Sequence, residues 1–169
     1  MVSFTGKILR TTAILFILAC TISCDQVSKS IVRERLNYSE DISVIGDHLV
    51  LTKVENKGAF LSLGSGLPHM ARFILLTVLP IIILFAVLTY LIVRRDLSRT
   101  FSVGLAFIVG GGIGNLYDRI LYGSVTDFLH IDLVWFRTGI FNMADVAVMV
   151  GVGIMIVHTL TRKQQDLKY

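Results

Sequence analysis

The hydrophobic positions of this chain fall into four long apolar runs, and polar segments separate them. The runs cover approximately residues 8–24, 69–93, 101–121 and 140–160. About 20 apolar residues are what a helix needs to cross the ~30 Å hydrocarbon core of a membrane. The second run is the clearest, because it contains no charged residue from Ile74 to Val93. The pattern predicts an all-α membrane bundle of four transmembrane helices.

The polar segments carry their own pattern. Residues 42–45 and 48–54 are short runs rich in branched aliphatic residues, and such runs predict strands. We therefore expect a small extracytoplasmic β element that lies against the membrane. The segment 118–139 contains Trp135 and Phe136, an aromatic pair that suits the headgroup level of a bilayer. The same pair could equally be a hydrophobic anchor for a loop.

Composition agrees with the membrane class. Of 169 residues, 54% are hydrophobic, and the mean hydropathy is +0.74, which is too high for an ordinary soluble domain. The length fits one integral membrane domain covering residues 1–169. We interpret the net charge of +4 as anchoring charge near anionic lipid. Membrane phospholipid is therefore an expected partner, and nucleic acid is not.

Basic residues indicate the orientation of the helices. They are dense before the first run, in the short link between the second and third runs, and after the fourth run. Dense basic residues in short segments mark the cytoplasmic side of a membrane. Cytoplasmic N- and C-termini follow, although eight more basic residues are spread over the longer segments of the other side. The dense group is Lys7, Arg10, Arg94, Arg95, Arg99, Arg162, Lys163 and Lys168.

Small residues and cysteines add three expectations. Five glycines between residues 104 and 114 predict close helix packing, with backbone room near a substrate as the alternative. Cys20 and Cys24 lie on one helix, so no disulfide is expected, and the four histidines are too scattered for a metal site. The first 24 residues also resemble a cleavable lipoprotein signal ending at Cys24. The three apolar runs that follow it favour a first helix that is retained rather than cleaved.

Two aspartates carry the candidate chemistry. Asp127 and Asp145 lie at the ends of apolar runs, where ionisable groups are costly and are kept mainly for function or pairing. Two close carboxylates tend to share one proton, as in aspartic proteases. Asp127 could instead be an ordinary loop acid, and Asp145 an acid in the first turn of a helix that Asn142 caps. Asp118 is a rival, but its neighbour Arg119 favours an ion pair.

Other polar residues have structural and functional interpretations. Asp25 and Lys29 are one helical turn apart and predict an ion pair that caps the first run, with substrate contact as a second role. Asp132 is expected to be solvated. The amides of the asparagines in the polar motifs could hold a backbone or lipid carbonyl. Gly58 offers a flexible point for a segment, residues 25–68, that moves over the site; a static sheet is the alternative.

Four polar motifs occur in a fixed order across the four runs. They are Asp-Gln-Val-Ser-Lys (25–29), Asn-Lys-Gly-Ala-Phe (56–60), Gly-Asn-Leu-Tyr-Asp-Arg (114–119) and Asn-Met-Ala-Asp (142–145), with Val-Thr-Asp-Phe (125–128) before the last. Together they resemble the bacterial lipoprotein signal peptidase family (signal peptidase II) over nearly the whole chain. The family commonly has Asn-x-Gly-Ala-Ala-Phe, whereas this chain has Phe60 one position earlier, followed by Leu61.

The resemblance implies an aspartic endopeptidase that removes signal peptides from diacylglyceryl-modified prolipoproteins. Cleavage before the lipidated cysteine is implied at the outer face of the bacterial cytoplasmic (inner) membrane, with no metal and no cofactor. Asp127 and Asp145 would be the catalytic pair, and we expect a monomer. The implied substrate-binding or supporting residues are Asp25, Lys29, Asn56, Gly58, Asn115, Arg119 and Asn142.

Two other functions use the same features. A proton-coupled carrier would use the acids as a relay, and an assembly protein would use buried polar side chains to hold helices together. A relay needs acids distributed over the depth of the bilayer. Asp127 and Asp145 fall on one side, which favours the peptidase.

Overall fold

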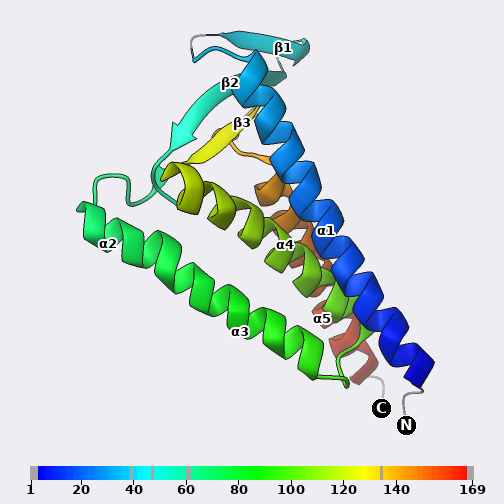
Figure 1. Cartoon of the computed structure of the whole chain (residues 1–169). Helices are drawn as coiled ribbons and strands as arrows, with labels where there is room; N and C mark the ends of the chain where they lie inside the picture. The colour runs from blue at the N-terminus through cyan, green and yellow to red at the C-terminus, as the bar shows by residue number, and fades with distance from the viewer. Residues whose placement is uncertain (1–3, 39, 47, 60–61, 134, 167–169) are drawn as a thin grey trace.

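The computed structural model describes residues 4–38, 40–46, 48–59, 62–133 and 135–166, except the side chains of residues 4, 5, 7 and 163–166. In this part of the chain, four helical stretches are long and apolar enough to cross a membrane: Ile8–Arg35, His69–Val93, Arg99–Tyr122 and Met143–Arg162. A small sheet lies at one end of these helices (Figure 1). We call this the sheet end of the bundle. The elements are α1 (Phe4–Arg35), β1 (Asp41–Ile45), β2 (Leu49–Asn56), α2 (His69–Phe73), η2 (Ile74–Val78), α3 (Leu79–Val93), α4 (Arg99–Tyr122), β3 (Val125–Leu133), β4 (Phe136–Arg137) and α5 (Met143–Asp166).

Helix α4 is the centre of the bundle and packs against α1, α3 and α5. It begins where the Ser98 hydroxyl accepts the backbone N–H of Phe101, and it ends at Gly123, which has a φ of 71°. A side chain at Gly111 would collide with the backbone carbonyl of Ala144 in α5. The glycine-rich run therefore serves close helix packing, as predicted.

The second span is one continuous helix built from α2, η2 and α3. The π-helical turn Ile74–Val78 comes just before Pro80, whose missing N–H cannot complete the regular ladder. Leu91 near its far end is fully buried, in a cluster that includes Leu18 of α1 and Val109 of α4. This cluster holds the second span to the bundle at the end opposite the sheet.

Helix α1 corrects the first predicted boundary. The apolar run was expected to end at residue 24, but the helix continues to Arg35. No glycine or proline interrupts residues 8–35, and the polar residues after Cys24 face α4 and α5. Beyond them, Val32 and Leu36 pack on Phe128 of β3. The extension of α1 thus packs against the sheet through these apolar residues.

The sheet is antiparallel with strand order β1-β2-β3-β4. The two strands expected in the segment 25–68 are confirmed as β1 and β2. Strands β3 and β4 were not predicted, and β3 places Asp127 opposite Val54 of β2. Asp127 is therefore part of a strand, and its interpretation as a loop acid is wrong. The long connection between β2 and α2 includes Phe60 and Leu61, which lie outside the described residues.

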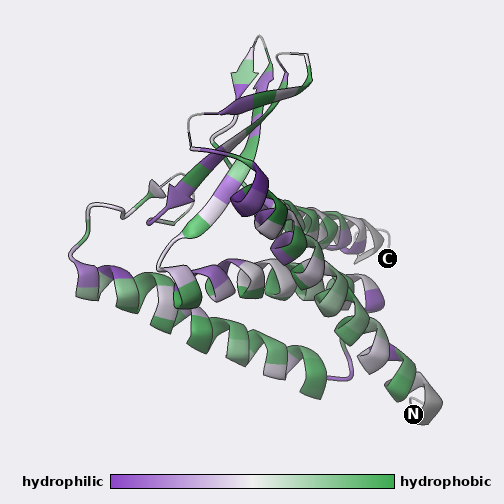
Figure 2. Cartoon of the chain, turned by 45° about the horizontal axis from the view of Figure 1, so that its top comes forward, coloured by the Kyte–Doolittle hydropathy of each residue, from purple (hydrophilic) through white to green (hydrophobic). Residues whose placement is uncertain are grey.

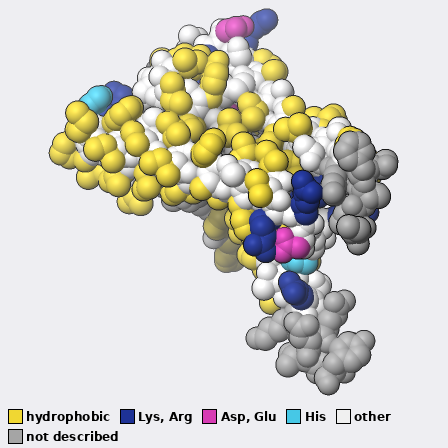
Figure 3. Space-filling model, turned by 60° about the horizontal axis from the view of Figure 1, so that its bottom comes forward, with side chains coloured by type: hydrophobic (Ala, Val, Ile, Leu, Met, Phe, Trp, Pro, Cys, Tyr) yellow, Lys and Arg dark blue, Asp and Glu magenta, His cyan; other side chains and the backbone are white. Residues whose placement is uncertain are grey.

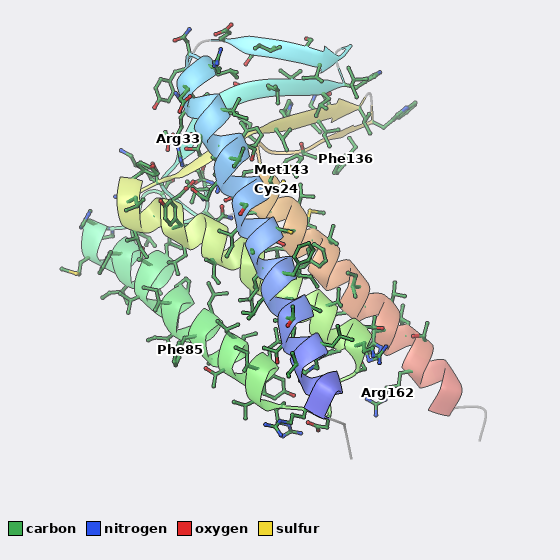
Figure 4. All side chains as sticks on the ribbon, turned by 45° about the vertical axis from the view of Figure 1, so that its right-hand side comes forward. Cys24, Arg33, Phe85, Phe136, Met143 and Arg162 are labelled. Carbon is green, nitrogen blue, oxygen red and sulfur yellow. The ribbon has the colours of Figure 1, made fainter. Side chains whose placement is uncertain are left out.

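The outer surface of the helices is apolar. Hydrophobic residues follow the helices while hydrophilic ones gather at the sheet and the helix ends (Figure 2), and hydrophobic side chains cover most of the helical face seen in Figure 3. Phe16 is 68% exposed and Phe85 72%, and Phe85 projects outward from α3 (Figure 4). Helices that satisfy their backbone groups internally can present such a surface to lipid.

Candidate active site

Asp127 is held in place by two asparagine amides. Its Oδ1 accepts the Nδ2–H of Asn142 at 2.6 Å, and its Oδ2 accepts the Nδ2–H of Asn56 at 2.9 Å. The residue is only 4% exposed. Burial raises the pKa of Asp127 to about 6, against the amide hydrogen bonds that lower it, and the negative charge of Asp145 adds to the rise.

Asp145 lies in the first turn of α5. The Asn142 side chain accepts the backbone N–H of Asp145 at 3.1 Å, and the Asp145 carboxylate accepts the backbone N–H of Asn142 at 3.2 Å. This reciprocal pair is a capping arrangement, so the expected helix start is confirmed. The other carboxylate oxygen accepts the Nδ2–H of Asn115 in α4 at 2.9 Å. The helix cap therefore also fixes the direction of the Asp145 side chain.

Asn142 connects the two carboxylates. Its Nδ2 donates to Asp127 and, at 3.0 Å, to the Oδ1 of Asn115. Both aspartates line a small cavity of about 40 Å³, which we call the central cavity. A cavity of roughly 10–15 Å³ or more can hold a water molecule among polar partners. Its lining residues are Asn56, Ala59, Asn115, Arg119, Val125, Asp127, Ile140 and Asp145.

The loop after β2 closes one side of the central cavity. Asn56 accepts the backbone N–H of Gly58 at 2.9 Å, and Arg119 donates to the carbonyl of Gly58 at 2.9 Å. A Cβ at Gly58 would lie 2.5 Å from the carbonyl carbon of Ser62. Glycine is therefore required here because the backbone passes so close, and Gly58 is buried and hydrogen-bonded.

Asp25, Lys29 and Asp118 form a buried ion cluster next to Asn115, the residue that holds Asp145. Lys29 has no exposed surface, and its Nζ donates to Asp25 at 2.8 Å, to the Oδ1 of Asn115 at 2.9 Å, and lies 3.2 Å from Asp118. The predicted pair between Asp25 and Lys29 is confirmed, but it lies within α1 and does not cap its end. Through Asn115, Lys29 orients the amide that holds Asp145.

Asp25 also reaches a second helix. Its Oδ1 accepts the backbone N–H of Ala144 at 2.9 Å, which satisfies a free donor at the start of α5. A Cβ at Gly114 would lie 2.5 Å from Oδ2 of Asp25, so this approach of α1 to α4 requires glycine. Asp25 thereby positions the helix turn that carries Asp145.

The expected ion pair between Asp118 and Arg119 is not formed. Neighbouring residues of a helix point in different directions. Asp118 instead lies 3.2 Å from Lys29 and 2.8 Å from Arg33, and Arg33 stacks on Tyr122. Arg33 was missed in the sequence, although it follows Lys29 by four residues and so shares its helix face. Since Asp118 is engaged in this cluster, it is no longer a rival for the candidate pair.

The remaining acid and the cysteines lie elsewhere. Asp132, expected to be solvated, forms a surface ion pair with Arg137 at 2.8 Å and keeps 28% of its side chain exposed. Cys20 and Cys24 are free and exposed. Within the described ranges, no three His, Cys, Asp or Glu side chains are grouped closely enough to hold a metal ion.

The sequence profile described as Signal peptidase (SPase) II matches residues 17–161, which contain every group of the site. The chain belongs to the signal peptidase II family. The lipoprotein signal peptidase of Listeria monocytogenes serotype 4a (strain HCC23) is 40% identical to it over 152 residues, 87% of this chain and 94% of the relative. The lipoprotein signal peptidase of Halothermothrix orenii (strain H 168 / OCM 544 / DSM 9562) is 35% identical over 145 residues, 86% of this chain and 93% of the relative.

The fold is shared with a solved relative. A bacterial membrane enzyme determined by the in meso method at 2.3 Å resolution superposes with a TM-score of 0.80 at 27% identity, over 91% of each chain. The family resemblance expected from the polar motifs is therefore confirmed, and so is the four-helix membrane fold with a small sheet. Asn56, Asn115 and Asn142 hold the candidate aspartates. Lys29, Gly58 and Arg119 contact one of these asparagines. Asp25 is one step further away, bonded to Lys29 and to the backbone of Ala144 beside Asp145.

Proposed function

We propose that this chain is an aspartic endopeptidase that removes signal peptides from prolipoproteins at the bacterial cytoplasmic membrane, with Asp127 and Asp145 as its catalytic pair. The observation that carries the proposal is that both carboxylates line one small cavity and share Asn142 as a hydrogen-bond partner. The relatives named lipoprotein signal peptidase support the substrate class.

The pair supplies an acid and a base. The ionised carboxylate accepts a proton from water as the water oxygen attacks the scissile carbonyl carbon, and the protonated carboxyl gives its proton to the carbonyl oxygen. When the tetrahedral intermediate collapses, the C–N bond breaks and the leaving nitrogen takes the proton that the base accepted. The second carboxyl regains its proton from the intermediate hydroxyl. The raised pKa of Asp127 favours this residue as the one that holds the proton.

Cleavage itself is the first test. The purified full-length chain, in detergent micelles, is expected to release the signal peptide from a diacylglyceryl-modified prolipoprotein. An unmodified prolipoprotein of the same sequence is the control for lipid dependence. Failure to cut the modified substrate, in protein shown to be folded, would overturn the proposed function.

The activity should depend on pH through Asp127. The pKa of this group lies near 6, above its ordinary value of 3.8, so the proton is retained to higher pH and is lost as the pH rises through about 6. We expect kcat/KM to fall on the alkaline side of that value, because the protonated partner of the pair disappears. A pH profile from 4.5 to 8.5 measures this. A rate that rises steadily through the whole range would contradict it.

The site is proposed to face away from the cytoplasm. The first described turn of α1 and the last described turn of α5 lie at the end of the bundle opposite the sheet (Figure 1). The link between α3 and α4 contains Arg94 and Arg95, is followed by Arg99 at the start of α4, and returns the chain at that same end. Since dense basic segments mark the cytoplasmic side, the sheet and the central cavity would be extracytoplasmic. We expect a monomer, because one chain supplies every group around the central cavity.

The lipid of the substrate is proposed to remain largely in the bilayer. An apolar hollow of about 260 Å³ lies between α1, α4 and α5, with Cys24 and Met143 on its walls (Figure 4). Cys20 and Cys24 on its walls are exposed, which supports the proposal that the hollow opens toward lipid. Each methylene moved from lipid to water costs about 0.8 kcal/mol, so acyl chains stay buried while the peptide bond meets the central cavity.

This arrangement predicts weak dependence on acyl length. Turnover should require the diacylglyceryl group yet change less than about threefold when the acyl chains are shortened by four carbons in a constant bilayer. Reconstituted enzyme and synthetic substrates of different acyl length provide the measurement. A steep loss of turnover with a few carbons would indicate a shaped acyl pocket.

A further inference from the structure

A second polar pocket lies beside the central cavity, between the start of the second span and the end of α4. It has a volume of about 60 Å³, and we call it the basic pocket. Basic side chains from three parts of the chain meet there: the loop after β2, α2 and α4. The lining residues are Lys57, His69, Arg72, Phe73, Leu76, Thr77, Arg119 and Gly123.

The basic pocket has an excess of positive charge on its walls, although one of its cations, Arg119, also faces the carboxylates of the central cavity. Three of its lining side chains are cationic at neutral pH, and none of the lining residues is acidic. The side chains of Lys57 and His69 form no hydrogen bond or ion pair with any described residue, and the buried Nε of Arg119 has no acceptor among those residues. Among the described residues, the Arg72 guanidinium donates to the carbonyl of Ser65 alone, at 3.2 Å. Cations gathered in this way repel one another unless an anion joins them.

The position of the basic pocket matches the headgroup layer. His69 begins the second span, and Arg119 lies in the last turn of α4, at the sheet end of the bundle. Phe73 and Leu76, on the same wall, continue the helix into its apolar part. Guanidinium groups bind phosphate oxygens through paired hydrogen bonds, and basic clusters at a membrane surface attract anionic lipid.

We propose that the basic pocket binds the phosphate group of an anionic species, either a phospholipid headgroup or free phosphate. Its oxygens would accept from Arg72, Lys57 and the free Nε of Arg119. Arg119 also lines the central cavity and holds the carbonyl of Gly58. A bound phosphate would therefore fix this arginine and the loop beside Asp127. The consequence for cleavage rests on the proposed function, whereas the binding does not.

Lipid binding to the purified full-length chain in detergent tests the site directly. Labelled phosphatidylglycerol is the probe, and unlabelled phosphatidylglycerol, phosphatidylcholine, diacylglycerol and inorganic phosphate are the competitors. Arg72→Gln should weaken phosphatidylglycerol binding about fivefold, the effect of one basic residue near anionic lipid. Lys57→Gln, at an exposed position, should act in the same direction and is the second variant if Arg72→Gln folds poorly. Arg35→Gln is the matched control, because Arg35 is exposed at the end of α1 and lines neither pocket.

The outcomes separate the two sources of phosphate. Competition by phosphatidylglycerol alone indicates a lipid headgroup, and competition by inorganic phosphate as well indicates a site for free phosphate. In vesicles, anionic lipid should accelerate prolipoprotein cleavage by the wild type and by Arg35→Gln, and less by Arg72→Gln. Equal phosphatidylglycerol binding by the wild type, Arg72→Gln and Lys57→Gln would overturn the site. Binding is measured without substrate, so a failure of the proposed function would leave this result intact.

Discussion

Asp127→Asn and Asp145→Asn are each expected to lower the rate of prolipoprotein cleavage by about 10³-fold or more. An amide has nearly the shape of a carboxyl group but can neither accept the proton of the attacking water nor donate one to the carbonyl oxygen. General acid–base catalysis typically contributes about 10²–10⁴-fold, and loss of either partner disables a pair that shares one proton. Single-turnover rates with purified variants in detergent measure the effect.

The matched control for these variants is Asp132→Asn. Asp132 belongs to the same strand as Asp127, but it is partly exposed and pairs with Arg137 at the surface. Its replacement should leave the cleavage rate within about twofold, because exposed ion pairs contribute little. Circular dichroism and thermal unfolding establish that each variant is folded. A folded Asp127→Asn or Asp145→Asn with more than a tenth of the wild-type rate would remove that residue from the catalytic pair.

Lys29→Met is expected to destabilise the protein severely. The Lys29 ammonium is fully buried and contacts Asp25, Asp118 and Asn115. Methionine approximates its length but leaves two buried carboxylates short of a cation. Removal of one partner from a buried ion pair costs about 3–5 kcal/mol. For a chain of this size, such a loss lowers the unfolding midpoint by about 6–20 °C.

Thermal unfolding in detergent tests this, with Arg35→Met as the control on an exposed position of the same helix. The control should shift the midpoint by no more than a few degrees. Lys29→Met should also lose cleavage activity at temperatures where it is still folded, because Asn115 loses the donor that orients it toward Asp145. An unfolding midpoint within about 2 °C of the wild type would show that the cluster does not stabilise the fold.

The sequence predicted the spans better than the polar elements between them. The second span was predicted at both ends, because it contains no charged residue from Ile74 to Val93 and Pro68 precedes it. The end of α1 was missed because hydropathy counts charges without their partners. Lys29 and Arg33 look like residues of a polar loop, yet both are neutralised by the buried Asp118 of α4, and Lys29 by Asp25 as well. Such pairing is a tertiary property that hydropathy does not contain.

The candidate site was likewise predictable where the signal is local in the sequence and unpredictable where it depends on tertiary contacts. The polar motifs singled out Asp25, Asn56 and Asn142, whose spacing within each motif is local and readable. The hydrogen bonds between motifs could not be read from the sequence, because Asp25 caps a helix 119 positions later and Asn56 holds an acid 71 positions away. Strand β3 was missed since it lacks the polar–apolar alternation of a surface strand: its first four residues are all buried, Asp127 included. The sheet that completes the central cavity therefore could not be predicted from the polar–apolar pattern of the sequence.

The central claim is that Asp127 and Asp145 act as one electrostatic unit, and carboxyl titration tests it most directly. Loss of activity alone can arise from a displaced helix, whereas the pKa of Asp127 reports the neighbouring charge itself. The measurement is a ¹³C titration of the Asp127 carboxyl in the wild type and in Asp145→Asn. We predict a pKa of about 6 in the wild type. It should be lower in Asp145→Asn, because a like charge is removed. A pKa of Asp127 that is unchanged by Asp145→Asn would contradict the shared pair.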